Sequence, residues 1–548
     1  MGRVVMNYDL IIKNARVLDG AGNPWFKSDL GIQAGKIAKM GKLSAQQADH
    51  TIDAHELCVS PGFIDIHSHS DVTIPFNPLA ESAVRQGITT LVVGSCGISV
   101  SPVNKKNESL LQRYLSPFLP SGQQLKMEWS SFGEYLKWQE KHGCSVNIAA
   151  LTGHGTVRIA AMGFDERKPT SKELEHMKEL VAEAMKSGAF GLSTGLIYPP
   201  GIFSDTAELI ELSRVAAEYG GVYFSHIRGE GATLLDAVKE AITIGEKAAI
   251  SVQVSHHKAA GKANWGKTIE TLKMMEAARE RGVDVTFDQY PYSAAMTTLV
   301  TLLPPWAHEG GLEKTLERLR DPAQREKMRR DIEKGILGWQ NWVGDCGWDK
   351  ITVSSVITEK NKMVEGKNLA EIAALRKQDE FTALCDLLLE EQGNATMVMH
   401  AMDEEDVRRV MKHHLQMVGT DAWSVAPYGI LGGGKPHPRF YGTYPRVLGR
   451  YARDEKLLTL EEAVRKSTSF PAVKLGLQDR GIIREGFWAD LVIFDPMRII
   501  DRATFADPHK YPEGIDCVVV NGKVVLEKGS HTKNLAGQVL KHSTHTLN

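Results

Sequence analysis

Cysteine is scarce in this chain, which has six cysteines among 548 residues. They lie far apart, with no paired spacing such as C-x-x-C: Cys58, Cys96, Cys144, Cys346, Cys385 and Cys517. This spacing argues against a disulfide framework and suits unpaired thiols in a reducing compartment. Five of the six are most simply explained as small buried hydrophobes.

Long apolar runs and blocks of one charge are also missing. No stretch reaches the roughly 20 apolar residues of a membrane span, and the first 20 residues hold no apolar run of signal-peptide length. The chain has 65 Lys and Arg against 67 Asp and Glu, a formal charge of -2, and these residues are spread along it. We therefore expect a cytoplasmic protein that binds neither nucleic acid nor a membrane surface.

Both ends of the chain are rich in short β-type runs separated by turns. Residues 8–60 show this pattern, and it returns after residue 479, where Asn521-Gly522 predicts a hairpin turn. We expect one small β-sandwich domain built from residues 1–61 and 479–548.

The middle of the chain alternates strand-like and helix-like segments. Eight apolar strand runs lie within 62–69, 87–97, 145–155, 188–196, 220–230, 249–258, 282–292 and 415–423. Capping pairs predict two of the helices, one starting at Thr170 and Glu173 and ending at Gly188, the other starting at Asp205 and Glu208 and ending at Gly220. This α/β pattern predicts a TIM-like (β/α)8 barrel over residues 62–478.

A long insertion of about residues 292–395 separates the seventh and eighth strands. It carries four tryptophans, Trp306, Trp339, Trp342 and Trp348. Insertions of this size after a barrel strand usually shape access to the site. These tryptophans have two interpretations. They could contact the substrate and favour apolar side chains or long acyl groups, or they could pack the core of the insertion itself.

Nearly every predicted strand ends in a residue of the kind that binds metals. These residues are His67 and His69, Cys96, His154, His226, His256 and His257, and Asp421. Each alone is weak evidence, because a histidine or an aspartate near a strand end is common. Their joint occurrence at the strand ends, where barrel active sites are built, predicts a metal site. His154 and His257 are not needed to complete it.

Several motifs resemble a known family. They are "PGFIDIHSHSD", "GSCGIS", "GLSTGLIYPPG", "YFSHIRGE", "VSHHKAAGKANWG" and "FDQYPY", together with the late Asp421. The chain resembles the amidohydrolase superfamily over nearly its whole length, and specifically its D-aminoacylase (N-acyl-D-amino-acid deacylase) branch.

The resemblance implies a role for Cys96. Many amidohydrolases bridge two metals with a carboxylated lysine, but the candidate strands "NIAALTGHG" and "AFGLSTGL" contain no lysine. D-Aminoacylases use a cysteine thiolate there, an anionic and polarisable zinc ligand. The resemblance implies a tighter zinc site and a second, weaker one that is partly empty. The tighter site would consist of Cys96, His226 and His256, and the weaker one of His67, His69 and Asp421.

The implied reaction is zinc-dependent hydrolysis of an N-acyl-D-amino acid to a carboxylate and a free D-amino acid. Asp421 would accept the proton of the attacking water and return it to the leaving amine. The family places substrate contacts at Lys258, Tyr198, Tyr290 and Arg439. Arg228 is a further candidate from position alone, and a structural ion pair is an equally good interpretation of it.

Two alternatives remain. The first is a related amidohydrolase that acts on cyclic amides or ureides, as hydantoinases and dihydroorotases do. The absence of a candidate for the bridging lysine disfavours it. A non-catalytic scaffold is disfavoured because every ligand type is retained. No motif encodes the side chain or acyl group that the substrate should have, the identity of the second metal or the oligomeric state.

Overall fold

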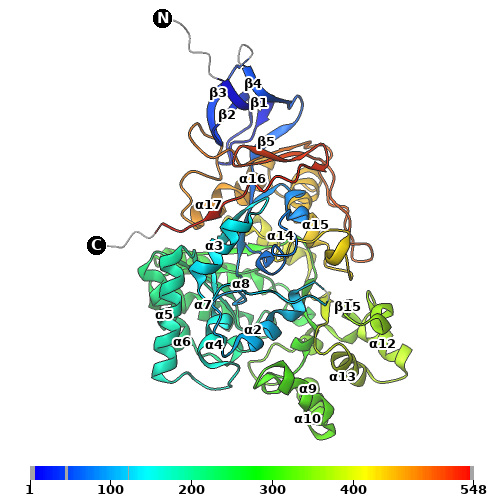
Figure 1. The fold of residues 1–548 in the computed structure, drawn as a ribbon. Coiled ribbons are helices and arrows are strands. Elements are labelled where there is room, and N and C mark those ends of the chain that lie inside the picture. The colour runs from blue at the N-terminus through cyan, green and yellow to red at the C-terminus, as the bar shows by residue number, and fades with distance from the viewer. Residues whose placement is uncertain (1–6, 44–46, 121, 544–548) are drawn as a thin grey trace, which may run out of the picture.

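The computed structural model describes residues 7–43, 47–120 and 122–543. Parallel strands and helices make up the central part of the molecule, and strands from both chain ends lie together above it (Figure 1). No helix in these ranges has the length and apolar character to cross a membrane.

The eight predicted central strands are present, and they lie in two parallel sheets. The first sheet contains β6 (Phe63–Asp65), β7 (Ile88–Val93) and β8 (Asn147–Ala150). The second contains β9 (Thr152–Gly153), β10 (Gly191–Gly195), β11 (Val222–His226), β12 (Ser251–Val254), β13 (Val285–Gln289) and β17 (Gln416–Val418). In both sheets these strands lie in sequence order, as repeated βα units require.

The two sheets meet on both sides. The third predicted strand contributes β8 to one sheet and β9 to the other, with only Leu151 between them. At the other side, Asp421 N donates to His67 O at 2.9 Å and His69 N donates to Ala422 O at 2.9 Å. The segments that follow β6 and β17 are therefore hydrogen-bonded to each other.

Helices follow the central strands and cover their outer side (Figure 1). They are α1 (Glu81–Val84), α2 (Glu108–Leu115), α3 (Phe132–His142), α4 (His154–Met162), α5 (Ser171–Ser187), α6 (Thr206–Glu218), α7 (Leu234–Ala248), α8 (Thr268–Glu280), α14 (Glu404–Lys412), α15 (Arg439–Arg446), α16 (Leu460–Ser467) and α17 (Ser469–Lys474). The predicted capping box at Thr170 and Glu173 is confirmed, as is the end of α5 at Gly188. Asp205 caps α6 as predicted.

Strands from both chain ends form one nine-stranded sheet. From the N-terminal side come β1 (Asn7–Val17), β2 (Phe26–Gln33), β3 (Lys36–Gly41), β4 (Gln47–Asp53) and β5 (Cys58–Pro61). From the C-terminal side come β18 (Leu491–Phe494), β19 (Ile515–Val520), β20 (Lys523–Glu527) and β21 (Ser530–His531). The two groups join where β18 pairs antiparallel with β5. The predicted Asn521-Gly522 hairpin turn is present between β19 and β20.

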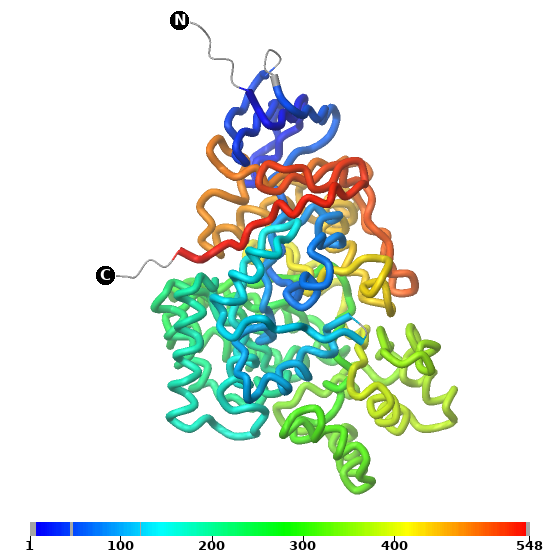
Figure 2. Tube along the Cα trace, in the orientation of Figure 1, coloured from blue at the N-terminus to red at the C-terminus, as the bar shows by residue number. Residues whose placement is uncertain are grey.

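The last described strand lies elsewhere. β22 (Val539–Leu540) leaves the chain-end sheet and pairs in parallel with β8. The red end of the tube in Figure 2 accordingly runs down toward the central part of the molecule. The C-terminal segment therefore contributes to two sheets.

The long insertion has its own sheet and core. Its antiparallel strands are β14 (Ala295–Thr298), β15 (Ile351–Ser355) and β16 (Thr396–Met399). Its helices are α9 (Leu312–Arg320), α10 (Pro322–Lys334), α11 (Trp342–Cys346), α12 (Leu369–Arg376) and α13 (Glu380–Glu390). Trp342 is buried in this core, and Trp306, Trp339 and Trp348 pack against it. Packing of the insertion itself thus accounts for all four tryptophans.

Candidate metal centre

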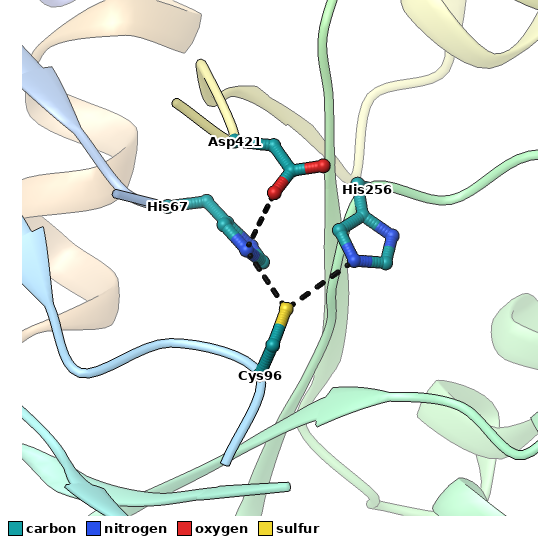
Figure 3. Close-up of side chains that lie close together, drawn as sticks. All are labelled: His67, Cys96, His256 and Asp421. Carbon is teal, nitrogen blue, oxygen red and sulfur yellow. Dashed lines mark hydrogen bonds and ion pairs between the residues drawn. The ribbon is translucent and has the colours of Figure 1, made fainter. Parts of the chain in front are cut away.

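Four of the predicted ligands converge on one point, and each comes from the segment that follows a central strand. His67 follows β6, Cys96 follows β7, His256 follows β12 and Asp421 follows β17. All four residues are buried, and one ligand atom from each lies within 4.8 Å of the others. Figure 3 shows the four side chains pointing toward one another.

The thiol of Cys96 lies between two imidazoles. Its Sγ atom is 3.2 Å from His67 Nε2 and 3.5 Å from His256 Nε2 (Figure 3). His67 Nε2 is also 3.5 Å from Asp421 Oδ1. Ligands at the corners of a tetrahedral zinc site, with bonds of about 2.0–2.3 Å, lie about 3.3–3.8 Å apart. The spacing of these donor atoms therefore suits a zinc ion.

Three of these four residues have a backbone conformation that L-residues rarely adopt. The φ angle is +53° at Cys96, +36° at His256 and +50° at Asp421. Such conformations cost about 1–3 kcal/mol each and persist where the surrounding structure holds them. They turn the chain sharply after each strand, so that the side chain points at the centre.

Gly97 lets the Cys96 segment approach β10 closely. Its φ is +72°, and a Cβ atom there would lie 2.8 Å from the backbone nitrogen of Gly195. No other residue fits this space without moving one of the two segments. The glycine after the cysteine is therefore a steric requirement of the turn.

The two remaining predicted ligands flank this group. His69 Nε2 lies 3.3 Å from Asp421 Oδ1. The ring centroid of His226, at the end of β11, lies 4.4 Å from that of His256. His226 forms a second possible ligand set with His256 and Glu230, and within the described residues neither of its ring nitrogens has a hydrogen-bond partner.

A carboxylate lies behind each imidazole that faces the thiol. Asp288 Oδ1 is 3.3 Å from His67 Nδ1, and Glu230 Oε1 is 3.0 Å from His256 Nδ1. In both rings this leaves Nε2 directed at Cys96 Sγ. His256 Nδ1 also lies 2.7 Å from Lys258 Nζ, which pairs with Glu230. A carboxylate close to the second nitrogen of a histidine is the usual support of a metal-binding imidazole.

The anionic groups of the centre are ionised, and three of its imidazoles hold protons: burial opposes this, but Cys96 and the neighbouring carboxylates raise the pKa of His67, His69 and His256. Burial alone raises the pKa of the Cys96 thiol, but the charges of His67 and His256 lower it well below its ordinary value. Burial likewise opposes ionisation of Asp421, and the Arg439 guanidinium keeps its pKa well below the usual range. Burial and the neighbouring His256 lower the pKa of His226, which leaves its imidazole neutral. Metals bind thiolate, carboxylate and neutral imidazole, so a metal bound here would displace protons from His67, His69 and His256.

Three of the predicted substrate contacts lie on one side of the group. Arg439 is buried at the start of α15, with Nη1 2.9 Å from Asp421 Oδ2. Its guanidinium lies over the ring of Tyr290, 4.6 Å from the centroid. The Tyr290 hydroxyl is buried and has no hydrogen-bond partner among the described residues. The ammonium of Lys258 pairs with Glu230 and lies 5.7 Å from the same ring centroid.

The fourth, Tyr198, lies beside His226. The two ring centroids are 5.0 Å apart in an edge-on arrangement. The Tyr198 hydroxyl accepts a hydrogen bond of 3.0 Å from Thr297 of the insertion. Tyr198 therefore stands between the predicted metal ligands and the insertion.

The sequence pattern of the amidohydrolase family matches residues 50–526. This range includes all the central strands and the residues of the centre. The chain belongs to the amidohydrolase family.

Relatives of this amidohydrolase match it along nearly its full length. N-acyl-D-glutamate deacylase of Alcaligenes xylosoxydans xylosoxydans is 38% identical over 521 residues, which cover 94% of this chain and 93% of that protein. The crystal structure of N-acyl-D-glutamate deacylase from Bordetella bronchiseptica, with zinc and a phosphonate mimic of the tetrahedral intermediate, has a TM-score of 0.81. It is 34% identical and aligns with 98% of this chain and 100% of its own.

A solved D-aminoacylase is similar to the same degree. It has a TM-score of 0.80 and 34% identity, with 97% of this chain and 100% of that chain covered. It is described as having a binuclear metal centre, with activation by one metal and attenuation by the second.

The residues whose role the sequence left open make structural contacts in this amidohydrolase. Arg228 forms a two-pronged ion pair with Glu240, with both contacts at 2.9 Å. His154 begins α4, and its Nε2 lies 2.7 Å from Glu208 Oε1. His257 Nε2 lies 2.8 Å from Thr271 Oγ1 in α8. These contacts favour the structural interpretation of all three.

Glu230 and Asp288 were not among the predicted site residues. Both stand inside motifs that were noted for other reasons, "YFSHIRGE" and "FDQYPY". The sequence did offer one indication of their role: each is a carboxylate at or just after the end of a predicted strand, as the predicted ligands are. Their partners follow other strands, β6 and β12, and contacts between separate strands are not visible in a local pattern.

Proposed function

We propose that this protein hydrolyses N-acyl-D-amino acids in a zinc-dependent reaction, releasing a carboxylate and the free D-amino acid. One observation carries the proposal: the Cys96 thiol lies between two imidazoles that are each backed by a carboxylate. It is supported by the relatives at 34–38% identity, which are described as deacylases of N-acyl-D-amino acids or as D-aminoacylase. The preference for D over L substrates rests on those relatives.

The donor set fits zinc. Cys96, His226 and His256 would hold the tighter ion, and His67, His69 and Asp421 a second, weaker one. Among the described residues neither ring nitrogen of the buried His226 has a hydrogen-bond partner, which supports its role as a ligand, because such atoms are rarely left without one. When bound, zinc polarises the scissile carbonyl and lowers the pKa of the attacking water to near 7.

Asp421 is the proton carrier in this proposal. Its Oδ1 faces His67 and His69, and its Oδ2 contacts Arg439. Because Arg439 keeps the pKa of this carboxyl low, Asp421 is ionised and can accept a proton from the attacking water. The same carboxyl then protonates the leaving nitrogen, since an amine anion does not leave unprotonated.

Arg439, Lys258 and Tyr290 bind the substrate carboxylate. The guanidinium and the ammonium lie over the ring that carries the hydroxyl. Two cations and a hydroxyl donor are suitable partners for a carboxylate. Tyr198 contacts the substrate on the other side of the predicted ligands, beside His226. This arrangement orients the scissile amide between Asp421 and the thiol.

We also infer the finer architecture. The contacts on both sides of the two parallel sheets support one closed (β/α)8 barrel. Residues of β1, β2 and β3 share a core with residues of β18 and β19, which supports a folded-over, sandwich-like chain-end sheet. Within the described residues every cysteine is unpaired, which supports a cytoplasmic location.

The decisive experiment combines zinc analysis with paired substrates. We expect about one to two zinc ions per chain and release of methionine from N-acetyl-D-methionine but not from N-acetyl-L-methionine. Asp421→Asn should keep the tightly bound zinc and lose at least about 100-fold in kcat, in line with the loss of a proton-transfer group. Turnover of a hydantoin but of neither acyl-methionine would instead support the cyclic-amide alternative, and zinc-free protein would support the scaffold.

A further inference from the structure

An apolar cavity of about 240 Å³ lies next to the metal centre. It is bounded by the segment after β7, by the loop that carries Tyr198 and by the start of the insertion. Its apolar and aromatic lining includes Ile98, Tyr114, Phe118, Phe164, Tyr198 and Val300. For scale, an engineered apolar cavity of about 150 Å³ holds a benzene molecule.

Two residues that line the cavity pack against predicted ligands. The Phe118 ring stacks on His69 with centroids 6.3 Å apart, and Tyr198 meets His226 at 5.0 Å. Ile98 stands two residues after Cys96. These contacts place the cavity beside the predicted ligands, on the side of Phe118 and Tyr198.

The carboxylate-binding residues lie elsewhere. Among the lining residues that the structure describes, none is Arg439, Lys258 or Tyr290. A substrate whose carboxylate is held by those three residues, with its amide at the metals, directs its acyl group away from them. The cavity lined by Phe118 and Tyr198 is the space on that side.

The described lining offers no free charge to a polar group. Arg113 and Glu313 both line the cavity and pair with each other at 2.8 Å. Burial lowers the pKa of His308 to about 4, so this imidazole is neutral, and its Nε2 lies 3.3 Å from Leu303 O. An apolar chain suits this surface better than a charged one.

We propose that this cavity binds the acyl chain, and that the preferred substrates are N-acyl-D-amino acids whose acyl group is apolar and longer than acetyl. The inference rests on the proposed deacylase function and specifies its substrate class. The volume accommodates several methylene groups, and each buried methylene strengthens binding about fourfold.

The test is a chain-length series on one amino acid. We would measure kcat/KM for the N-acetyl, N-butanoyl, N-hexanoyl and N-octanoyl derivatives of D-methionine. The expected result is a rise of about tenfold or more from acetyl to hexanoyl. A flat or falling profile, with N-acetyl-D-methionine turned over well, overturns the inference and leaves the proposed function standing.

A matched pair of variants locates the effect. Val300→Trp places a large ring in this cavity, and Ile430→Trp makes the same kind of change in the adjoining cavity of about 280 Å³. The hexanoyl-to-acetyl ratio of kcat/KM should fall about tenfold in Val300→Trp and stay as in the wild type in Ile430→Trp. If Val300→Trp instead alters the ranking of amino acids in a series of N-acetyl-D-amino acids, the cavity holds the side chain and the inference is wrong.

A binding measurement separates the cavity from the reaction. If no N-acyl-D-amino acid is turned over, the proposed function fails, and octan-1-ol binding by calorimetry then tests the cavity alone. Binding that is weakened in Val300→Trp supports an apolar-chain site, and no binding to the wild type overturns it.

Discussion

At the scale of single residues, the centre depends on strained and buried groups that support one another. Cys96, His256 and Asp421 all have positive φ angles. Asp288 connects two of the predicted ligand residues, since its Oδ1 lies 3.3 Å from His67 Nδ1 and accepts a hydrogen bond of 2.7 Å from the backbone nitrogen of His256. One carboxylate thus positions the ring of one predicted ligand and the backbone of another.

Replacing the central thiol should remove metal and activity together. Cys96→Ala deletes the atom that faces both His67 and His256, so we expect loss of the tightly bound zinc and a fall in kcat/KM of at least about 100-fold. Zinc analysis and turnover of N-acetyl-D-methionine measure both. Cys385→Ala, which removes a buried thiol from the insertion core, should retain zinc and activity. A zinc-loaded and active Cys96→Ala variant would contradict the assignment.

Asp288→Asn tests the positioning role. The amide keeps the size of the side chain but loses the charge that faces His67, so zinc affinity should fall about 10- to 100-fold. Competition with a chromogenic chelator measures it. The matched control is Asp284→Asn. Asp284 directly precedes β13 and pairs with Lys474, away from the predicted ligands. Equal zinc affinities of the two variants would show that Asp288 does not support the ligand.

At the scale of elements, the helix and strand positions were the part most open to prediction. The α5 helix was predictable because its capping box and terminal glycine are local signals. The convergence of the strand-end residues His67, Cys96, His256 and Asp421 was predictable because the ends of parallel strands meet at one edge. The insertion sheet was not predicted, because β14 pairs with β16 across roughly a hundred residues. The contacts of Glu230 and Asp288 were missed for the same reason, since they join separate strands.

The turn after β7 offers a test at this scale. Gly97→Ala adds a Cβ atom that would lie 2.8 Å from Gly195 N, in addition to the cost of a positive φ. Gly335→Ala is the matched control, because its φ is +74° and no atom lies within 4 Å of the added Cβ. We expect Gly335→Ala to lose about 1 kcal/mol of unfolding free energy. Gly97→Ala should lose clearly more and bind zinc more weakly.

Chemical denaturation and zinc titration measure the two effects. If both variants lose the same stability and keep the wild-type affinity for zinc, the close approach of the Cys96 segment to β10 is not required for the site.

At the scale of the whole molecule, the centre joins segments that are far apart in the sequence. His67 comes from the first central strand and Asp421 from the last, and they meet at the junction of the two parallel sheets. Anything that binds across this junction binds only the folded state and therefore stabilises it.

Zinc should accordingly stabilise the whole fold. At a free zinc concentration about 1,000 times the dissociation constant, the gain is about 4 kcal/mol. We expect the melting temperature to rise by a few degrees when chelator-treated protein is reloaded with zinc, as seen by differential scanning calorimetry. Cys96→Ala should melt at the same temperature with and without zinc. An identical response of both proteins would place the stabilising ion outside this centre.

The pairing of β18 with β5 sets an order for synthesis. When β5 leaves the ribosome, its partner has not yet been made and follows several hundred residues later. At about 5–20 residues per second, β5 waits for about half a minute or more. During that time its edge is open to other chains. A chain cut short before β18 keeps this edge unpaired, so we expect truncated chains to aggregate or to be degraded, and only the finished chain to accumulate.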